Sequence, residues 1–426
     1  MKKILFYSDC FVYSGSEHVL ENLIKSPDIY EQYEMMFAYA YSPQYKKQVK
    51  KIYPVNRTVD LKSLKILSAL NNWGYKYKLT NQKTFRYYYY GFRFFVSYFF
   101  EVTGIHNLYN LVLLLHLFRK KKPDILFINN GGYPGARSCR IAVIAAKLTG
   151  IDKIVFVVNN LAMTQKNFLE KQLDKFIGEK VSYFITASEA ARKRLIQFRH
   201  FNPQKCIAIP NTLSTTKEQH AYSLKKMLRE EFEIDNDTVI LGSVGLLTAR
   251  KGFNVLIEAI RRLDNSIVQN TPFKLLIFGD GEDKPKLQKQ ITESGLEKKV
   301  VLAGYRDDIL SYMNSFDIFI LPSIGFEDFP YVIIEAMLLK KPVIGTNVAG
   351  IPEQIQDEYN GYVVEPNNAQ ELTQAIAKLV ADRAMQTTMG LNGYSLYNER
   401  FRNSIIIHKY LNIFSSLVET GFTCNE

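Results

Sequence analysis

The sequence is poor in cysteine and contains no long apolar run. Its 426 residues include four scattered cysteines, with no CxxC pair and no histidines at the spacing of a zinc site. This pattern argues against a disulfide framework or a metal site and favours a reducing, cytoplasmic environment. No segment has the roughly 20 consecutive apolar residues that a transmembrane helix requires, so nothing in the sequence predicts a membrane span.

Positive charge is concentrated in one segment, residues 44–122. This segment holds 12 lysines and four arginines against two acidic residues, whereas the whole chain has a net charge of +12. Basic residues alternate with aromatic ones, most densely in the run FRYYYYGFRFF at 85–95, and a second apolar run, Leu108–Phe118, ends in four basic residues. Such a mixture is typical of the headgroup region of an anionic bilayer, which is the interpretation we favour.

Two other interpretations of this segment stay open. Aromatic runs are more often helical core elements with solvated lysines, and a basic patch also attracts nucleic acid. No nucleic-acid-binding motif accompanies the segment, so we expect no nucleic-acid partner. Co-sedimentation with anionic liposomes at low salt tests the membrane interpretation, and an absence of binding would contradict it.

Length and hydrophobic patterning predict two α/β domains. A chain of 426 residues exceeds one ordinary core and suits two domains of about 200 residues. Twelve short apolar runs alternate with helical patterns, as in parallel sheets whose strands are buried on both faces. The expected strands are Ile4–Tyr7, Met35–Ala40, Asp124–Ile128, Ile154–Val158, Tyr183–Thr186, Cys206–Ile209, Val239–Val244, Leu275–Phe278, Val300–Ala303, Ile318–Leu321, Val343–Gly345 and Tyr362–Val364. We predict a first domain at 1–212 with the basic insertion at 44–122, a linker at 213–237, a second domain at 238–393 and a helical segment at 394–426.

The stretch 325–353, GFEDFPYVIIEAMLLKKPVIGTNVAGIPE, contains a charged residue in an unusual place. From Tyr331 to Leu339 the predicted helix is apolar on every side except at Glu335. A helix that is apolar all round is buried, and a carboxylate is almost never buried without a partner. We therefore expect Glu335 to face a site where a polar ligand binds, and Glu327 to lie in the loop before the helix.

This stretch resembles the E-x7-E signature of retaining glycosyltransferase family four, whose usual form is close to EGFGxxxLEAMAxGxPVIxxxxGGxPE. The matching residues are Glu327, Glu335–Met337, Pro342–Ile344 and Gly350–Glu353. The resemblance implies an α/β fold of two Rossmann-like domains, the GT-B architecture, with an inter-domain cleft. It also implies a C-terminal helix that crosses back to the first domain.

The resemblance assigns the donor diphosphate to a loop of the second domain. Arg250 to Gly252 follows the first strand of that domain and resembles the end of the family motif GRLxxxKG, with Leu246 at the arginine position. Lys251 is implied to bind the diphosphate, because phosphates need cations and backbone N–H groups. We hypothesise that Arg250 replaces the missing arginine.

Other residues of the second domain receive roles in the same way. Glu335 is implied to accept hydrogen bonds from the ribose hydroxyls, as acidic residues do in Rossmann folds. Glu327 is implied to contact the donor sugar close to the reacting carbon. The N–H groups of Tyr331 and Val332 are expected to reach the distal phosphate, whereas Pro330 has none to offer. Glu327, Lys251 and Arg250 are thus the candidate catalytic residues.

The first domain contributes weaker signals. Ser14 to Glu17 follows the first strand and resembles the family's GGxE loop, so Gly15 and Ser16 are expected to bind the donor phosphates. Many relatives carry a histidine after the fourth strand of this domain, where this chain has Asn159 and Asn160. Asn160 is retained as a candidate hydrogen-bond donor to the sugar. The turn from Gly279 to Glu282 resembles a family turn with a structural part.

Neither a metal nor a cofactor is expected. Asp235 to Asp237 is formally a DxD motif, but it lies just before a predicted strand, where Asp and Asn are ordinary turn formers. His18 is more typical of a surface or packing residue than of a general base. The nucleotide-sugar, UDP- or GDP-linked, is a substrate and not a cofactor.

The resemblance implies transfer of a sugar with net retention of anomeric configuration, independent of metal. The basic aromatic insertion favours a lipid-linked or membrane-assembled glycan acceptor, and a protein bound peripherally to the inner face of the cell membrane. A sugar-nucleotide epimerase of the same architecture is one alternative, although it would not need the insertion. A catalytically silent partner of another glycosyltransferase is the second, because the family's arginine and histidine are absent at Leu246 and Asn160.

Overall fold

The computed structural model describes residues 1–10, 15–40, 42–52, 58–61, 105–165, 167–215, 224–263 and 271–419. Contacts divide the chain into two compact units. Unit 1 comprises Met1–Thr186, Arg192–Ile209 and Ile407–Glu426, and unit 2 comprises Ala187–Ala191 and Pro210–Ile406. Most of the basic aromatic segment, residues 62–104, lies outside the described residues, so its predicted membrane role stays a prediction.

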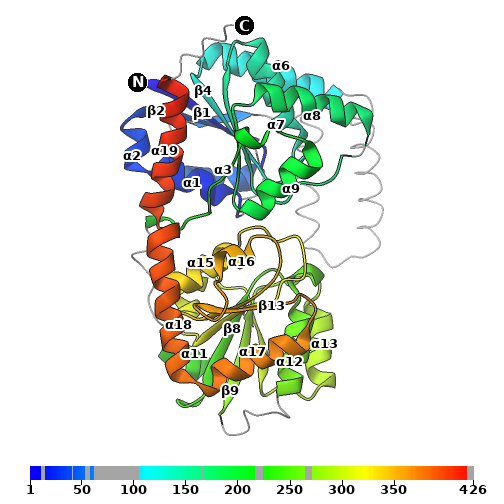
Figure 1. Cartoon of the computed structure of the whole chain (residues 1–426), viewed down its shortest axis with the longest axis vertical. Coiled ribbons are helices and arrows are strands. Elements are labelled where there is room, and N and C mark those ends of the chain that lie inside the picture. Colours follow the sequence, from blue (N-terminus) through cyan, green and yellow to red (C-terminus); the bar gives the residue numbers. More distant parts are fainter. Residues whose placement is uncertain are drawn as a thin grey trace. The chain divides into compact units, whose positions relative to one another are not determined.

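Unit 1 is built on a parallel sheet in the order β3-β2-β1-β4-β5-β6-β7 (Figure 1). Its strands are β1 (Lys2–Ser8), β2 (Tyr33–Ala40), β3 (Thr58–Leu61), β4 (Ile125–Asn130), β5 (Lys153–Val158), β6 (Tyr183–Thr186) and β7 (Cys206–Ala208). The six strands predicted in this half of the chain are confirmed. The additional strand β3 pairs along one side only, and its sequence TVDL lacks the apolar run of a strand buried on both faces.

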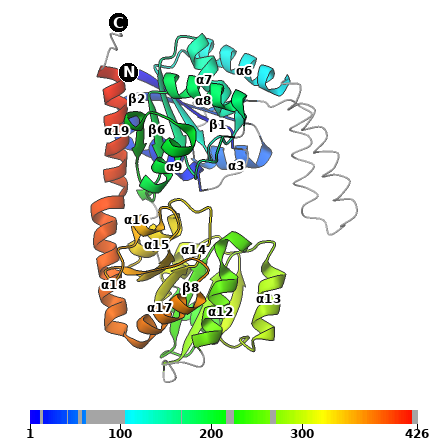
Figure 2. The ribbon, with the colours of Figure 1, turned by 45° about the vertical axis from the view of Figure 1, so that its right-hand side comes forward.

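Alternating side chains of this sheet build two apolar layers. Leu5 and Tyr7 of β1 pack in one cluster with helices α6 (Ile105–Lys121) and α7 (Arg137–Leu148), and Figure 2 shows α7 beside this sheet. Phe6 is aligned with Phe127 of the neighbouring strand, with ring centroids 5.1 Å apart. Successive residues of a strand point to opposite faces, so β1 contributes to both layers.

The remaining helices of unit 1 include the last helix of the chain. The helices are α1 (Glu17–Lys25), α2 (Pro27–Tyr30), α3 (Pro43–Ile52), α8 (Phe168–Lys180), α9 (Glu189–Arg199) and α19 (Asn403–Glu419), the first residues of α9 and of α19 belonging to unit 2. Phe414 of α19 packs against Phe127, with ring centroids 6.0 Å apart. The predicted return of the C-terminal helix to the first domain is therefore confirmed.

Helix α6 falls within the basic segment and is described in full. Leu114, Leu117 and Phe118 are buried, whereas Leu108 and Val112 are more than half exposed. One face of this helix therefore belongs to the core, which agrees with the packed-core interpretation for this part of the segment. Among the described helices, none is long and apolar enough to cross a membrane.

Unit 2 contains a second parallel sheet, in the order β10-β9-β8-β11-β12-β13. Its strands are β8 (Val239–Val244), β9 (Phe273–Phe278), β10 (Val300–Gly304), β11 (Ile318–Leu321), β12 (Val343–Thr346) and β13 (Gly361–Val364). All six predicted strands of this half are confirmed. Short uninterrupted apolar runs identify them because each strand is covered on both faces.

Helices cover both faces of this second sheet (Figure 1). Val239 and Leu241 of β8 face a cluster with α12 (Phe253–Leu263) and α17 (Ala369–Ala381), whereas Ile240 faces a cluster with α15 (Tyr331–Leu338). The other helices are α11 (Lys225–Glu231), α13 (Lys284–Glu293), α14 (Ile309–Met313), α16 (Ile351–Gln354) and α18 (Arg383–Leu396). Because the sheet is parallel, the loops after its strands meet at one edge.

The predicted linker differs from the structure in one respect. Within 213–237 the chain forms helix α11, whose Leu228 is fully buried in the core of unit 2 together with Leu213. Contacts place the start of unit 2 at Pro210. The polar composition of the stretch obscured a short helix that buries one leucine and leaves its lysines in water.

Candidate active site in unit 2

The loop after β8 is shaped by a left-handed glycine. A single 3-10 turn, Ala249–Lys251, ends at Gly252, which has φ +67°. A Cβ at this position would lie 2.0 Å from the carbonyl oxygen of Pro322. Only glycine therefore lets this loop approach the loop after β11, and helix α12 starts at the next residue.

The turn after β9 supports the same loop. Gly279 has φ +138°, and a Cβ there would lie 1.9 Å from the carbonyl oxygen of Gly245. A Cβ on Gly281 would lie 2.3 Å from the carbonyl oxygen of Leu247. The turn at 279–282 thus has the structural part expected of it, since its glycines allow close contact with the loop that carries Lys251.

Three of the predicted residues lie together. One carboxylate oxygen of Glu327 accepts hydrogen bonds from Lys251 Nζ at 2.5 Å, from Arg250 Nη1 at 3.1 Å and from Ser323 Oγ at 3.3 Å. The backbone holds the two loops at this distance, because the Ile324 N–H donates to the Arg250 carbonyl at 2.8 Å. We call Arg250, Lys251 and Glu327 the 250–327 cluster.

The members of this cluster differ in exposure. The side chains of Lys251 and Glu327 are 9% and 13% exposed, whereas that of Arg250 is 42% exposed. Lys251 and Glu327 therefore interact in a poorly hydrated environment, where charges attract more strongly than in water. With two cations and one carboxylate, the cluster carries a net positive charge and suits an anionic ligand.

Helix α15 holds the second glutamate of the signature. Glu335 is 4% exposed, as expected from a single charge on an apolar helix. Pro330 is the N-cap residue of this helix, and Tyr331 and Val332 are its first two residues. The first N–H groups of a helix have no partner within it, and in many proteins such groups donate to ligand oxygens.

Sequence reasoning missed Asp328, which follows Glu327. It is 5% exposed, and one of its oxygens accepts a hydrogen bond from Ser188 Oγ. The pKa of Asp328 is raised to about 7. Burial is the main cause, the Ser188 hydrogen bond acts in the opposite direction, and the nearby charges of Glu353 and Glu327 add to the rise. The signal was present, since the usual signature has glycine where this chain has Asp328.

Close packing fixes the surroundings of Asp328. A Cβ on Gly350 would lie 2.4 Å from the Asp328 carbonyl oxygen and 2.6 Å from Ser188 Cβ. Glu353 accepts hydrogen bonds from the N–H groups of Glu189 and Ala190 at 2.8 and 2.7 Å. The final glycine and glutamate of the signature thus position the loop that carries Glu327.

The predicted residues Gly15, Ser16 and Asn160 lie in unit 1, whereas the 250–327 cluster lies in unit 2. Ser16 is the N-cap residue of α1, and Ser14 lies outside the described residues. Asn160 is exposed and its side-chain oxygen accepts the N–H of Leu161 at 2.8 Å. Their donor-binding role stays a prediction.

The loop that contains Gly15 is anchored by a buried glutamate. Glu17 is fully buried and accepts hydrogen bonds from Ser8 Oγ at 3.0 Å, from Asn129 Nδ2 at 3.0 Å and from the Tyr45 hydroxyl. Burial raises the pKa of Glu17. Hydrogen bonds from four side chains lower this pKa and so offset part of the rise. The last residue of the GGxE-like loop therefore holds helix α1 against the sheet.

The motifs judged inert occupy ordinary positions. Asp235 and Asp237 are exposed in the turn before β8, and His18 lies 3.4 Å from Glu21. No group of three or more His, Cys, Asp or Glu that could hold a metal ion occurs within the described ranges. Leu246, at the family's arginine position, is 56% exposed.

Comparison with known proteins relates the chain to glycosyltransferases. Residues 225–396 match the family described as glycosyl transferases group 1. The capsular polysaccharide biosynthesis glycosyltransferase CapM of Staphylococcus aureus is 27% identical over 331 residues, which cover 75% of this chain and 83% of that protein. The chain thus resembles this family over residues 225–396, which lie in unit 2. This glycosyltransferase is also 25% identical to the UDP-Gal:alpha-D-GlcNAc-diphosphoundecaprenol alpha-1,3-galactosyltransferase of Escherichia coli, over 67% of this chain and 73% of that protein.

Solved structures establish the fold of this glycosyltransferase. HepE of Anabaena in complex with UDP has a TM-score of 0.74 at 20% identity and covers 98% of this chain and 100% of its own. A glycosyltransferase from Rickettsia africae has a TM-score of 0.75 at 18% identity and covers 99% of both chains. The fold is GT-B, as predicted, and none of these relatives supports the epimerase alternative.

Proposed function

We propose that this glycosyltransferase moves a sugar from a nucleotide-sugar donor to a lipid-linked or membrane-assembled glycan, with retention of anomeric configuration and without a metal. The observation that carries the proposal is the 250–327 cluster, which lies within the family match and joins two cations to one carboxylate. A UDP-sugar donor is favoured over a GDP-sugar donor, because HepE of similar fold binds UDP.

Lys251 and Arg250 are the proposed partners of the donor diphosphate. Their nitrogens lie 2.5 and 3.1 Å from the same Glu327 oxygen, so both cations reach one point. A diphosphate at this point would receive a buried ammonium and a more exposed guanidinium, the latter from a position next to the family's lysine. Glu327 is proposed to turn to the hydroxyls of the donor sugar once the phosphate oxygens neutralise Lys251.

Helix α15 is proposed to bind the rest of the donor. Glu335 is the proposed partner of the ribose hydroxyls, because a buried carboxylate accepts two hydrogen bonds from a diol. The N–H groups of Tyr331 and Val332 are proposed to donate to the distal phosphate, with support from the helix dipole.

The proposed reaction is a front-face transfer. The bond between the anomeric carbon and the leaving phosphate oxygen breaks, and the acceptor oxygen forms its bond on the same face of the sugar. The acceptor's proton passes to the leaving diphosphate, whose charge Lys251 and Arg250 balance. The protein then contributes positioning and electrostatic stabilisation of the leaving group, not a covalent nucleophile.

The acceptor is proposed from two observations. The two sequence relatives described above are named for capsular polysaccharide biosynthesis and for a diphosphoundecaprenol substrate. The chain itself carries the basic aromatic segment 44–122, whose composition suits an anionic membrane surface. We therefore place the protein in the cytoplasm, peripherally bound to the inner face of the cell membrane.

One incubation tests this function. Purified protein is mixed with radiolabelled UDP- or GDP-sugars and a membrane fraction, with and without EDTA, and label is followed into lipid and polysaccharide. We expect transfer from one donor that survives EDTA, and NMR of the product should show the donor's anomeric configuration. Transfer abolished by EDTA, or an inverted product, would contradict the corresponding part of the proposal. No transfer from any donor would favour the silent-partner alternative.

A further inference from the structure

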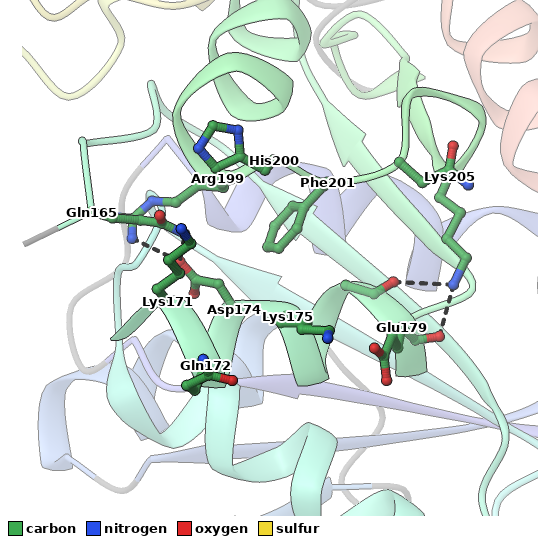
Figure 3. Close-up of a pocket in the computed structure, with 12 residues that line it drawn as sticks. Gln165, Lys171, Gln172, Asp174, Lys175, Glu179, Arg199, His200, Phe201 and Lys205 are labelled. Carbon is green, nitrogen blue, oxygen red and sulfur yellow. Dashed lines mark hydrogen bonds and ion pairs between the residues drawn. The ribbon is translucent and has the colours of Figure 1, made fainter. Parts of the chain in front are cut away.

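A pocket lies entirely within unit 1. Helix α8 and the segment 199–205, between α9 and β7, enclose a pocket of about 720 Å³ (Figure 3). We call it the α8 pocket. Figure 3 shows Arg199, His200 and Phe201 on the wall that faces α8. The volume falls in the range of small-molecule sites.

The floor of the α8 pocket is a buried ion network. The side chains of Arg199 and Asp174 are fully buried and their atoms Nη1 and Oδ2 lie 3.0 Å apart. Arg199 also pairs with Glu170 at 2.9 Å, and Tyr133 donates its hydroxyl proton to Asp174 at 2.8 Å. Arg199 Nε is buried and has no hydrogen-bond partner within the described part of the chain. An orphaned guanidinium N–H in the floor calls for an acceptor oxygen.

The shape of the pocket is fixed by core packing. Helix α9 ends at Arg199, and the next residue, His200, adopts the left-handed conformation with φ +56°, unusual for a residue other than glycine. This turn directs Phe201 inward, where its ring stacks on Phe184 with centroids 4.2 Å apart. Gly178 makes room, since a Cβ there would lie 2.9 Å from the Phe201 ring. The wall is therefore a rigid part of the fold.

The rim of the pocket carries a net positive charge. Lys171 and Lys175 are exposed and stand four residues apart on α8, so they lie on the same helix face. Neither forms an ion pair with another of the described residues. Lys205 is occupied, because its Nζ donates to three backbone carbonyl oxygens at 2.8 to 3.1 Å. Glu179 is the one acidic residue of the rim that is exposed, so two cations face one anion.

We propose that the α8 pocket binds a phosphorylated carbohydrate. The exposed amines of Lys171 and Lys175 suit the phosphate oxygens, which accept charge-assisted hydrogen bonds. The covered Nε–H of Arg199 offers a further donor to a ligand that reaches the floor. The amides of Gln165, Gln172 and Asn202 also line the pocket. Gln165 Nε2 donates to Asp174 at 3.0 Å and Asn202 Oδ1 accepts the Gln204 N–H at 2.9 Å, which leaves the Gln165 oxygen, the Asn202 nitrogen and the whole Gln172 amide for sugar hydroxyls. A phosphate ion alone would leave most of the 720 Å³ unfilled. The proposal does not depend on the transferase reaction.

The test is calorimetric titration of the full-length protein with glucose 6-phosphate, inorganic phosphate and glucose at low and high salt. We expect glucose 6-phosphate to bind more tightly than phosphate, glucose not to bind, and added salt to weaken the complex. The double variant Lys171→Gln/Lys175→Gln should weaken binding at least tenfold. Lys120→Gln/Lys193→Gln, which removes two exposed lysines elsewhere in unit 1, is the matched control and should bind as the wild type does.

Three outcomes would overturn this proposal. The first is unchanged binding by the Lys171→Gln/Lys175→Gln variant. The second is equal affinity for phosphate and glucose 6-phosphate, which would remove the carbohydrate part. The third is loss of binding in Lys251→Ala, which would place the ligand at the 250–327 cluster. Vesicles with and without phosphatidylglycerol distinguish a lipid phosphate from a sugar phosphate. If the protein binds the anionic vesicles more tightly than glucose 6-phosphate, and the double variant loses this binding, the ligand of the pocket is a lipid headgroup. Transfer activity is measured separately, so failure here leaves the proposed function intact.

Discussion

Replacing Asp328 by asparagine should make unit 2 more stable at alkaline pH. The carboxyl group is buried, and its pKa rises from an ordinary 3.8 to about 7. Between these values the folded protein holds a proton that the unfolded chain has lost, so stability falls as pH rises through this interval. Asparagine cannot ionise, yet its oxygen still accepts the hydrogen bond that Ser188 gives to the aspartate.

The size of this effect follows from the pKa. Each pH unit between the two values corresponds to about 1.4 kcal/mol, so wild-type unit 2 should lose roughly 3 kcal/mol between pH 5 and its folded pKa of about 7. The Asp328→Asn variant should not lose this contribution. For a domain of this size, the difference in melting temperature should grow by about 6–12 °C between pH 5 and pH 8.

Thermal unfolding of both proteins at pH 5, 6, 7 and 8 measures the difference, and hydrogen exchange of peptides from α15 assigns it to unit 2. Asp237→Asn, which removes an exposed aspartate of the same unit, is the matched control and should show no such trend. Ser188→Ala should move the wild-type transition to higher pH, because its hydrogen bond lowers the pKa of Asp328. A melting-temperature difference between Asp328→Asn and wild type that stays constant from pH 5 to pH 8 would refute the reasoning.

Three further predictions concern the two units. Lys251→Ala should lose most turnover while folding normally. Arg250→Ala should weaken donor binding about as much as Lys251→Ala does, since both cations meet at one Glu327 oxygen. Unchanged donor affinity in calorimetry of Arg250→Ala would contradict the shared role. Arg199→Leu should destabilise unit 1 by about 3–5 kcal/mol in urea unfolding, because Asp174 would be left buried without its cation; a loss below 1 kcal/mol would be inconsistent with a closed ion network. Gly252→Ala should destabilise unit 2 by more than about 1 kcal/mol and lower donor affinity, since alanine disfavours φ +67° and its Cβ would clash with Pro322. Wild-type stability and wild-type donor affinity in this variant would show that the loop can rearrange freely.

The strands could be predicted from the sequence because a parallel strand buried on both faces is a short uninterrupted apolar run. Val239–Val244 and Ile318–Leu321 were predicted with the bounds the structure gives them. β3 was missed for the same reason, since TVDL at an edge has no such run. Helix α11 was missed because one buried leucine among lysines and glutamates carries no periodic signal.

The candidate site could be predicted only in part. The motif identified Lys251 and Glu327, but they stand 76 residues apart, and their contact depends on the close approach of two loops at Gly252. The buried carboxyl group of Asp328 was not predicted. The usual signature has glycine at this position, so the difference from the signature, and not the agreement with it, marked the residue. The α8 pocket left no local signal, since its floor pairs Arg199 with an aspartate 25 residues away.

The contact between Lys251 and Glu327 has a consequence for ligand choice. Before any donor arrives, this lysine already has an anionic partner 2.5 Å away, on a side chain that is 13% exposed. A ligand that enters must therefore displace a carboxylate and cannot simply occupy open space. An anion with one charge replaces one partner by an equal one and gains little, whereas a diphosphate brings more charge than the glutamate it displaces. If the 250–327 cluster binds the donor as proposed, Glu327 competes with that donor for Lys251, and only an anion with more than one charge gains by binding there.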